Sequence, residues 1–176
     1  MFFAGFAANE FFNNKTETHL RDRLDISKEV QGALSTLPTP DLKQKTLNLV
    51  ADIRELLASE DQEHLKIRQR YEDKTKHLGP EYSEYDDPIL QDAWSEMTTA
   101  YAESSQTTVR LYNERYRVDA VLLREEMVAR LPEEVIERGD VFTGTKAYNR
   151  YYLANNSGII EDIALDLEKL AKLFPE

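Results

Sequence analysis

The chain has 176 residues, of which 41% are hydrophobic and 31% are charged. This composition is typical of a folded globular protein, and the length suits a single domain with its own core over residues 1–176. The formal net charge of −11 works against non-specific binding to nucleic acid or to an anionic membrane, and it favours a partner protein with a basic surface. Because the chain has no cysteine, disulfides and thiolate metal sites are excluded.

The first 12 residues, MFFAGFAANEFF, hold five of the seven phenylalanines and neither lysine nor arginine. As a helix this segment covers about 18 Å, less than the ~30 Å hydrocarbon core of a bilayer. Three interpretations remain open: a helix packed in the core, the remainder of a membrane anchor, or a segment that docks on a membrane surface or a partner. The residues concerned are Phe2, Phe3, Phe6, Phe11 and Phe12.

Helical signals dominate the chain, beginning with a region over residues 4–37 that ends at Pro38. Thr39 is expected to be the N-cap of the next helix, with Pro40 at its first helical position. This second helix should end at Gly79. Its stripe consists of Leu42, Thr46, Leu49, Ile53, Leu56, Glu60, His64, Ile67, Tyr71 and Leu78.

The longest predicted helix covers residues 88–131, with Asp87 as its N-cap, because no proline or glycine interrupts it after Pro88. The short polar connection before it predicts an antiparallel hairpin with the second helix. A straight helix of this length would measure about 66 Å, against about 40 Å for a compact domain of this size. Either the domain is elongated or the helix bends, and the polar residues 103–108 are the expected position of a bend.

The remaining segments are shorter. We expect a helix from Pro132 to about Gly139, a loop over residues 140–145, a brief helix over residues 146–154, and a last helix capped by Ser157. One face of that last helix carries Ile160, Ile163, Leu167, Leu170 and Phe174. The predicted fold class is therefore all-α, an elongated antiparallel bundle of about four main helices and some short ones, built around a long helical hairpin.

A polar layer interrupts the apolar stripes of the predicted hairpin. If the hairpin turns near residue 83, Glu60 and His64 lie level with Ser105 and Tyr101, and Thr108 is close by. Such a layer is a hypothesis for a small-ligand pocket or a proton-responsive element, because histidine titrates near neutral pH. The alternative is a hydrogen-bonded layer that only fixes the register of the helices.

The sequence contains no complete motif for a di-iron site or for a phosphate-binding loop. A di-iron carboxylate bundle needs paired Glu-x-x-His motifs, whereas this chain offers one such stretch, Asp61 to His64. The glycine-rich stretch 139–146 exchanges the Lys and Thr of a phosphate-binding loop, and it follows a predicted helix where that motif requires a strand. We therefore predict no metal site, no cofactor and no enzymatic activity.

Two surface features are candidates for binding a partner. Between His77 and Arg110 there is no lysine or arginine, and acidic residues alternate there with aromatic ones, a pattern that suits a basic protein segment. A second group of tyrosines lies together near residue 150. The alternatives are a solvated loop and a cover for the end of the core. The candidates are Tyr82, Glu84, Tyr85, Asp86, Trp94, Tyr148, Tyr151 and Tyr152.

These observations favour a non-enzymatic helical interaction or scaffold module. In one form of this hypothesis, the module is the soluble part of a membrane-anchored protein. Two alternatives remain: a ligand-binding sensor bundle that uses the polar layer, and an acidic inhibitor of a basic partner protein. Homo-oligomerisation and attachment to a membrane through the N-terminus also stay open, as does the compartment. The alternating Arg and Glu residues after Arg110 indicate a solvated face with weak ion pairs and no nucleic-acid partner.

Overall fold

The computed structural model describes residues 32–78 and 87–174, and this part of the chain contains helices and no strand. The all-α prediction is confirmed there. The phenylalanine-rich segment 1–12 and the candidate residues Tyr82, Glu84, Tyr85 and Asp86 lie outside the described residues. The helices are α2 (Thr39–Thr75), α3 (Pro88–Arg115), α4 (Arg117–Arg130), α5 (Glu133–Arg138), α6 (Gly144–Tyr152) and α7 (Ser157–Leu173).

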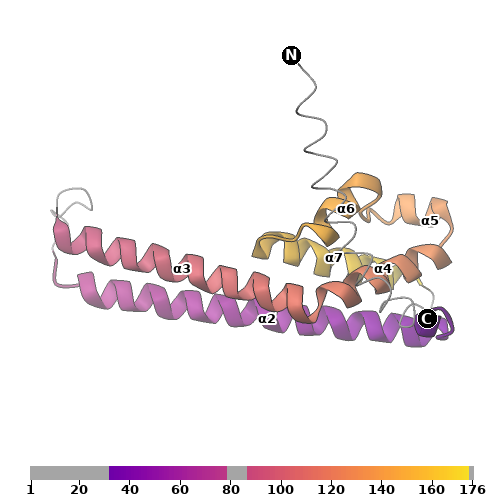
Figure 1. Ribbon diagram of the computed structural model, residues 1–176, viewed down its shortest axis with the longest axis horizontal. Helices are drawn as coiled ribbons and strands as arrows, with labels where there is room; N and C mark the ends of the chain where they lie inside the picture. Colours follow the sequence, from indigo (N-terminus) through magenta and orange to yellow (C-terminus); the bar gives the residue numbers. More distant parts are fainter. Residues whose placement is uncertain (1–31, 79–86, 175–176) are drawn as a thin grey trace, which may run out of the picture.

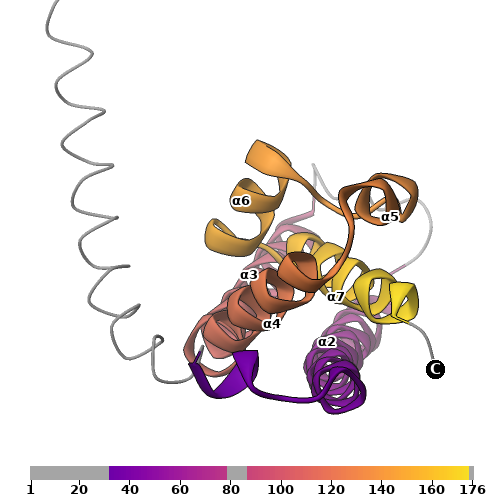
Figure 2. The same cartoon turned by 90° about the vertical axis from the view of Figure 1, so that its right-hand side faces the viewer.

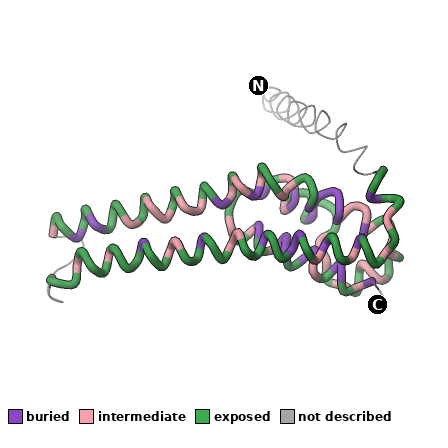
Figure 3. Tube along the Cα trace, turned by 90° about the horizontal axis from the view of Figure 1, so that it is seen from below, coloured by how far each residue is buried: buried purple, intermediate pink, exposed green. Residues whose placement is uncertain are grey.

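Helices α2 and α3 lie side by side and antiparallel along the longest axis of the molecule (Figures 1 and 3). The start of α3 is as predicted: the Asp87 carboxylate accepts hydrogen bonds from the backbone N–H groups of Ile89 (2.7 Å) and Leu90 (3.4 Å). The prediction for α2 was wrong by one residue, because Thr39 is already helical and the N-cap position belongs to Pro38. A proline has no side-chain acceptor, so this helix starts without a side-chain cap.

The predicted helix over residues 88–131 is two helices, and the expected bend at residues 103–108 was wrong. Residues 103–108 are regular helix, since the Ser105 hydroxyl hydrogen-bonds across to α2 and does not compete for its own backbone. The break is at Tyr116, whose φ of −119° is far from the helical value. On either side of it, Asn113 (3.5 Å) and the Arg117 guanidinium donate to backbone carbonyls at the end of α6. Figure 1 shows α4 leaving the direction of α3 at this point.

The wider end of the molecule, which we call the head, is formed by α4, α5, α6, α7 and the first half of α2. Helix α7 packs on α2 and α4, while α5 and α6 lie farther out on the same side (Figure 2). The predicted stripe of α7 is confirmed as core. Its members are all less than 10% exposed: Ile160, Ile163, Leu167, Leu170 and Phe174.

Two boundaries in the head differ from prediction. Helix α7 is capped by Asn156, whose side-chain oxygen accepts from the N–H of Ile159 at 2.9 Å, so the predicted cap Ser157 is instead the first helical residue. Its hydroxyl is thereby released for a contact with α2. Helix α6 begins at Gly144, two residues early, and that glycine has a φ of +50°, which an L-residue adopts only with strain.

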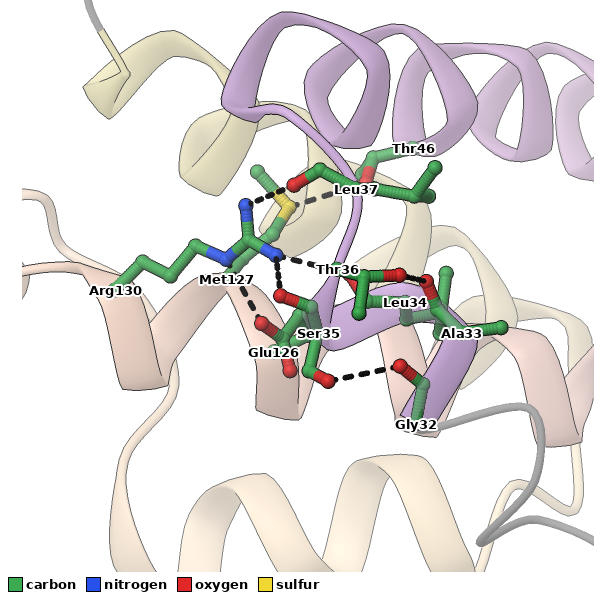
Figure 4. A network of polar contacts seen from close by, with 10 residues as sticks. All are labelled: Gly32, Ala33, Leu34, Ser35, Thr36, Leu37, Thr46, Glu126, Met127 and Arg130. Carbon is green, nitrogen blue, oxygen red and sulfur yellow. Dashed lines mark hydrogen bonds and ion pairs between the residues drawn. The ribbon is translucent and has the colours of Figure 1, made fainter.

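Arg130 attaches the chain that precedes α2 to α4 (Figure 4). Residues 32–35 are helical, and the last carbonyls of such a helix have no partner within it. The Arg130 guanidinium donates to three carbonyls at and just after the end of this helix, those of Leu34 (2.9 Å), Ser35 (3.2 Å) and Leu37 (2.8 Å), while Glu126 accepts from its Nε at 2.8 Å. A cation at this position both satisfies the carbonyls and complements the helix dipole.

Beyond the head, α2 and α3 continue as a two-helix projection, which we call the arm and define as residues 61–75 and 88–104. Helix α7 begins beside Glu60 and ends beside Lys43, so it covers only the half of α2 nearest the head. Within the arm only Ile67, Leu90 and Ala93 are buried, and Figure 3 shows the rest as exposed or intermediate.

Candidate functional site

The predicted polar layer centres on Glu60, whose side chain is only 5% exposed. One carboxylate oxygen accepts a hydrogen bond from the Ser105 hydroxyl of α3 at 2.6 Å, and the other accepts from the Ser157 hydroxyl of α7, also at 2.6 Å. Three helices therefore meet at one buried carboxylate. Ser157 is the first residue of α7, so the positive end of that helix also faces the negative charge.

His64 lies one helical turn farther along α2, at the border between head and arm. Its Nε2 atom is 3.6 Å from a Glu60 oxygen, beyond hydrogen-bond range, and this buried atom has no hydrogen-bond partner. The imidazole packs edge-on against the Tyr101 ring at a centroid distance of 4.7 Å. The Tyr101 hydroxyl in turn donates to the His64 carbonyl at 3.4 Å.

Two open cavities flank the layer. One of about 420 Å³ lies between α2 and α3 and is lined by Glu60 and Thr108, and one of about 400 Å³ lies between α2 and α7 and is lined by Glu60, His64 and Ser157. The structure thus brings together the five residues that the sequence placed in this layer. That they bind a ligand stays a prediction. Ser157 was missed, because its contact with α2 spans 97 residues of sequence.

A second buried polar cluster was not predicted at all. Asp166 of α7 is 2% exposed; its carboxylate accepts from the Phe142 N–H at 2.6 Å and from the Tyr151 hydroxyl at 2.8 Å. The Arg124 Nε is 3.7 Å from the same carboxylate, and its guanidinium donates to the Phe142 carbonyl. A signal was available, because Asp166 follows Ile163 by three residues and so lies on the apolar face of α7.

The electrostatics of this cluster follow from burial. Desolvation raises the pKa of Asp166 above its ordinary value, against the opposing effects of the Phe142 N–H, the Tyr151 hydroxyl and Arg124. Desolvation, with the nearby carboxylate, also raises the pKa of Tyr151 well above 10, so the phenol stays neutral and remains a donor. The cluster joins α6 and the loop before it to α7, which indicates a structural role.

The tyrosines proposed for partner binding differ in position. Tyr151 is 1% exposed, so its hydroxyl and ring serve the core, in line with the alternative interpretation. Tyr148 is 45% exposed and stacks on Tyr152 with ring centroids 4.8 Å apart. Tyr152 donates to Glu125 at 2.9 Å, and burial together with this carboxylate raises the pKa of Tyr152 to about 12. Trp94, on the arm, is 45% exposed.

No family model, curated protein or solved structure matches this chain. Within residues 32–78 and 87–174, no group of three or more His, Asp or Glu side chains is placed to hold a metal ion. In the same part of the chain, none of the helices combines the length and the apolar character that a membrane crossing requires.

Proposed function

We propose that this protein is a non-enzymatic helical interaction module in which the arm is the docking element. The observation that carries the proposal is that α7 begins beside Glu60 and runs from there towards Lys43, away from the arm. Past that level, α2 and α3 leave large apolar side chains in solvent: Leu65 is 61% exposed, Ile89 54% and Trp94 45%. Side chains of this size on a projecting two-helix element are typical of surfaces that bind another protein.

The overall architecture that we propose for this module is an elongated antiparallel bundle built around the hairpin. Helix α2 alone has 37 residues, which corresponds to about 55 Å. A two-stranded helical projection buries little apolar surface, and most helical stability in proteins comes from tertiary packing. A partner that packs on the arm would therefore stabilise it as well as bind it.

The proposal is tested by site-specific photo-crosslinking in living cells. A benzophenone amino acid is introduced at Trp94 or Met97 in the arm, and at Leu153 in the head as the control, since Leu153 is also 50% exposed. We expect covalent adducts from the arm positions and none from Leu153. Failure of both arm positions to form adducts, or adducts at Leu153 alone, would refute the proposal.

The form of the proposal that includes membrane attachment depends on the five phenylalanines of residues 1–12. It predicts that the full chain co-sediments with phosphatidylcholine vesicles and that a variant with Phe2, Phe3, Phe6, Phe11 and Phe12 changed to Ser does not. Neutral vesicles are the appropriate probe because a charge of −11 would mask binding to anionic ones. Equal sedimentation of the two proteins would eliminate this form and leave the arm proposal intact.

A second candidate function is a ligand sensor that uses the polar layer. It is favoured by one observation, the buried His64 Nε2 atom that has no partner and lies next to the 400 Å³ cavity. The test is a thermal-shift screen with a library of common metabolites. We expect a stabilising compound whose effect disappears in His64→Ala and persists in the control His77→Ala, an exposed histidine at the end of α2. Absence of any shift for the wild type, or a shift that His64→Ala retains, removes this candidate.

A further inference from the structure

The face of the hairpin that α7 leaves free carries a continuous groove. Two cavities of about 420 and 280 Å³ follow each other along it, and Ile67, Arg70 and Ala100 line both. All residues that line these cavities belong to α2 or α3. The cavity on the α7 side of α2 is a different one, lined by Leu57, Asp61 and other residues. We call the joined cavities the hairpin groove.

The floor of the hairpin groove is built for close approach of another helix. On α3 it is lined by Ala93, Met97, Ala100, Ser104 and Thr108, which follow one another at helical steps of three and four. Four of these five side chains are small. Small residues at such spacing let a second helix come near the backbone and pack along the groove.

The two rims of the hairpin groove differ in charge. The α2 rim includes three basic residues, Lys66, Arg70 and Lys74, together with two acidic ones, Glu63 and Asp73. Glu60 also lines the groove, but it is buried. The charged residues of the α3 rim are both acidic, Glu96 and Glu103. A helix pair that binds in this groove therefore needs acidic residues facing the α2 rim and basic residues facing the α3 rim.

We propose that the hairpin groove is the contact surface between two copies of this chain, related by a two-fold axis parallel to the hairpin. Rotation about this axis places α2 of one copy opposite α3 of the other at the same height. The Lys74–Glu96 ion pair within one copy marks that height. In the dimer, Lys74 and Arg70 of each copy come next to Glu96 of its partner, so the same surface supplies both required flanks, as an isologous contact demands.

The position of the head permits this arrangement. Figure 2 shows α5, α6 and α7 together on one side of the α2–α3 pair, and the hairpin groove lies on the other. The helical residues 32–35 are held by Arg130 near the start of α2, far from Leu56 where the groove begins. With the axis perpendicular to the hairpin, α2 would face α2 and the acidic rims would meet, which like-charge repulsion disfavours.

The size of the groove fits a reversible dimer. Residues from Leu56 to Lys74 line its α2 side, which gives a length of about 27 Å, and two helices side by side are about 20 Å wide. Each copy then contributes about 540 Å², and the total of about 1,100 Å² just exceeds the ~1,000 Å² expected of a specific interface. The inference rests on the proposed function, since it names a second copy as what the arm binds. This contact uses the hairpin groove, which Met97 lines and which Leu65, Ile89 and Trp94 do not line.

The test is sedimentation velocity of the full chain from micromolar to submillimolar concentration, combined with a charge exchange. The wild type is expected to sediment as a dimer at the upper end of this range. Arg70→Glu/Lys74→Glu, and separately Glu96→Lys/Glu103→Lys, should each weaken the dimer about tenfold or more, because like charges then meet across the interface. An equimolar mixture of the two variants should regain the dimer. The altered, acidic α2 rim of one variant then faces the altered, basic α3 rim of the other.

Two control variants distinguish the effect of the rim charges from the effect of the changed net charge. Lys45→Glu/Arg138→Glu and Glu133→Lys/Glu137→Lys change the same charges at exposed positions outside the groove, and they should dimerise like the wild type. A monomeric wild type, dimers that survive both rim variants, or a mixture that stays monomeric would each overturn the inference. Adducts between an arm benzophenone and a different protein, together with a monomeric wild type, would overturn the dimer while supporting the arm as a docking element.

Discussion

The buried Asp166 gives the sharpest stability prediction. Asp166→Ala removes the acceptor of the Tyr151 hydroxyl and the hydrogen-bond partner of the Phe142 N–H. Tyr151 is 1% exposed, so water cannot replace the lost contact. Each buried donor that is left without an acceptor costs about 1–3 kcal/mol. The two donors together predict a loss of about 4 kcal/mol, a large part of the 5–15 kcal/mol that stabilises a domain.

The assay is urea denaturation followed by circular dichroism. The matched control is Asp162→Ala, which removes the same side chain from the same helix but from an exposed ion pair with Arg150, and it should cost less than about 1 kcal/mol. Tyr151→Phe should cost about 1–2 kcal/mol, and Asp166→Ala should cost less in that background than in the wild type. If Asp166→Ala and Asp162→Ala destabilise equally, the argument from burial is wrong.

The same residue predicts a pH dependence. Because burial raises the pKa of Asp166 in the folded state, the folded protein holds this proton more tightly than the unfolded chain does. The resulting stabilisation is complete below the unfolded pKa and is lost as the pH rises through the folded pKa. The free-energy cost of Asp166→Asn relative to wild type should therefore be larger near pH 3 than near pH 6. A cost that grows with pH would contradict the assigned direction.

Four further substitutions, the last of them a control, test other features by the same denaturation assay. Glu60→Ala should cost about 2–4 kcal/mol, because two seryl hydroxyls lose their acceptor; a cost near zero would mean that the polar layer holds nothing together. Arg130→Met should cost about 1.5–3 kcal/mol, because the carbonyls of Leu34, Ser35 and Leu37 lose a charged hydrogen-bond donor, and no cost would show that water replaces it. Gly144→Ala should cost about 1–2 kcal/mol at a φ of +50°, whereas Gly158→Ala, whose new Cβ comes no nearer than 3.4 Å to its neighbours, should be neutral or stabilising.

Features that depend on local chemistry were predictable from sequence. The start of α3 follows from an aspartate before a proline, and the core face of α7 follows from spacing alone. The association of Glu60 with Ser105 was also predictable, because counting residues from the expected turn places them level in an antiparallel pair. Each of these inferences uses one helix or two neighbours in sequence.

Features that depend on distant segments were not predictable. No proline or glycine marks the break at Tyr116, and its flanking residues contact the carbonyls of Tyr152 and Ala154 at the end of α6. Ser157 reads as a helix cap by residue type, yet Asn156 takes that role and Ser157 contacts Glu60. Asp166 acquires its partners only when α6 folds over α7. In all three cases the decisive atoms are brought together by tertiary packing.

The order of the helices has a consequence for synthesis. The last described helix, α7, packs on the first half of α2, and Lys43 near the start of α2 donates to the Phe174 carbonyl at 3.3 Å. While the chain emerges from the ribosome, the hairpin can form early, but Leu42, Leu49 and Ile53 stay without their cover until α7 has been made. The arm can thus form before the head is complete, and a chain interrupted before Ser157 exposes its core and is prone to aggregate.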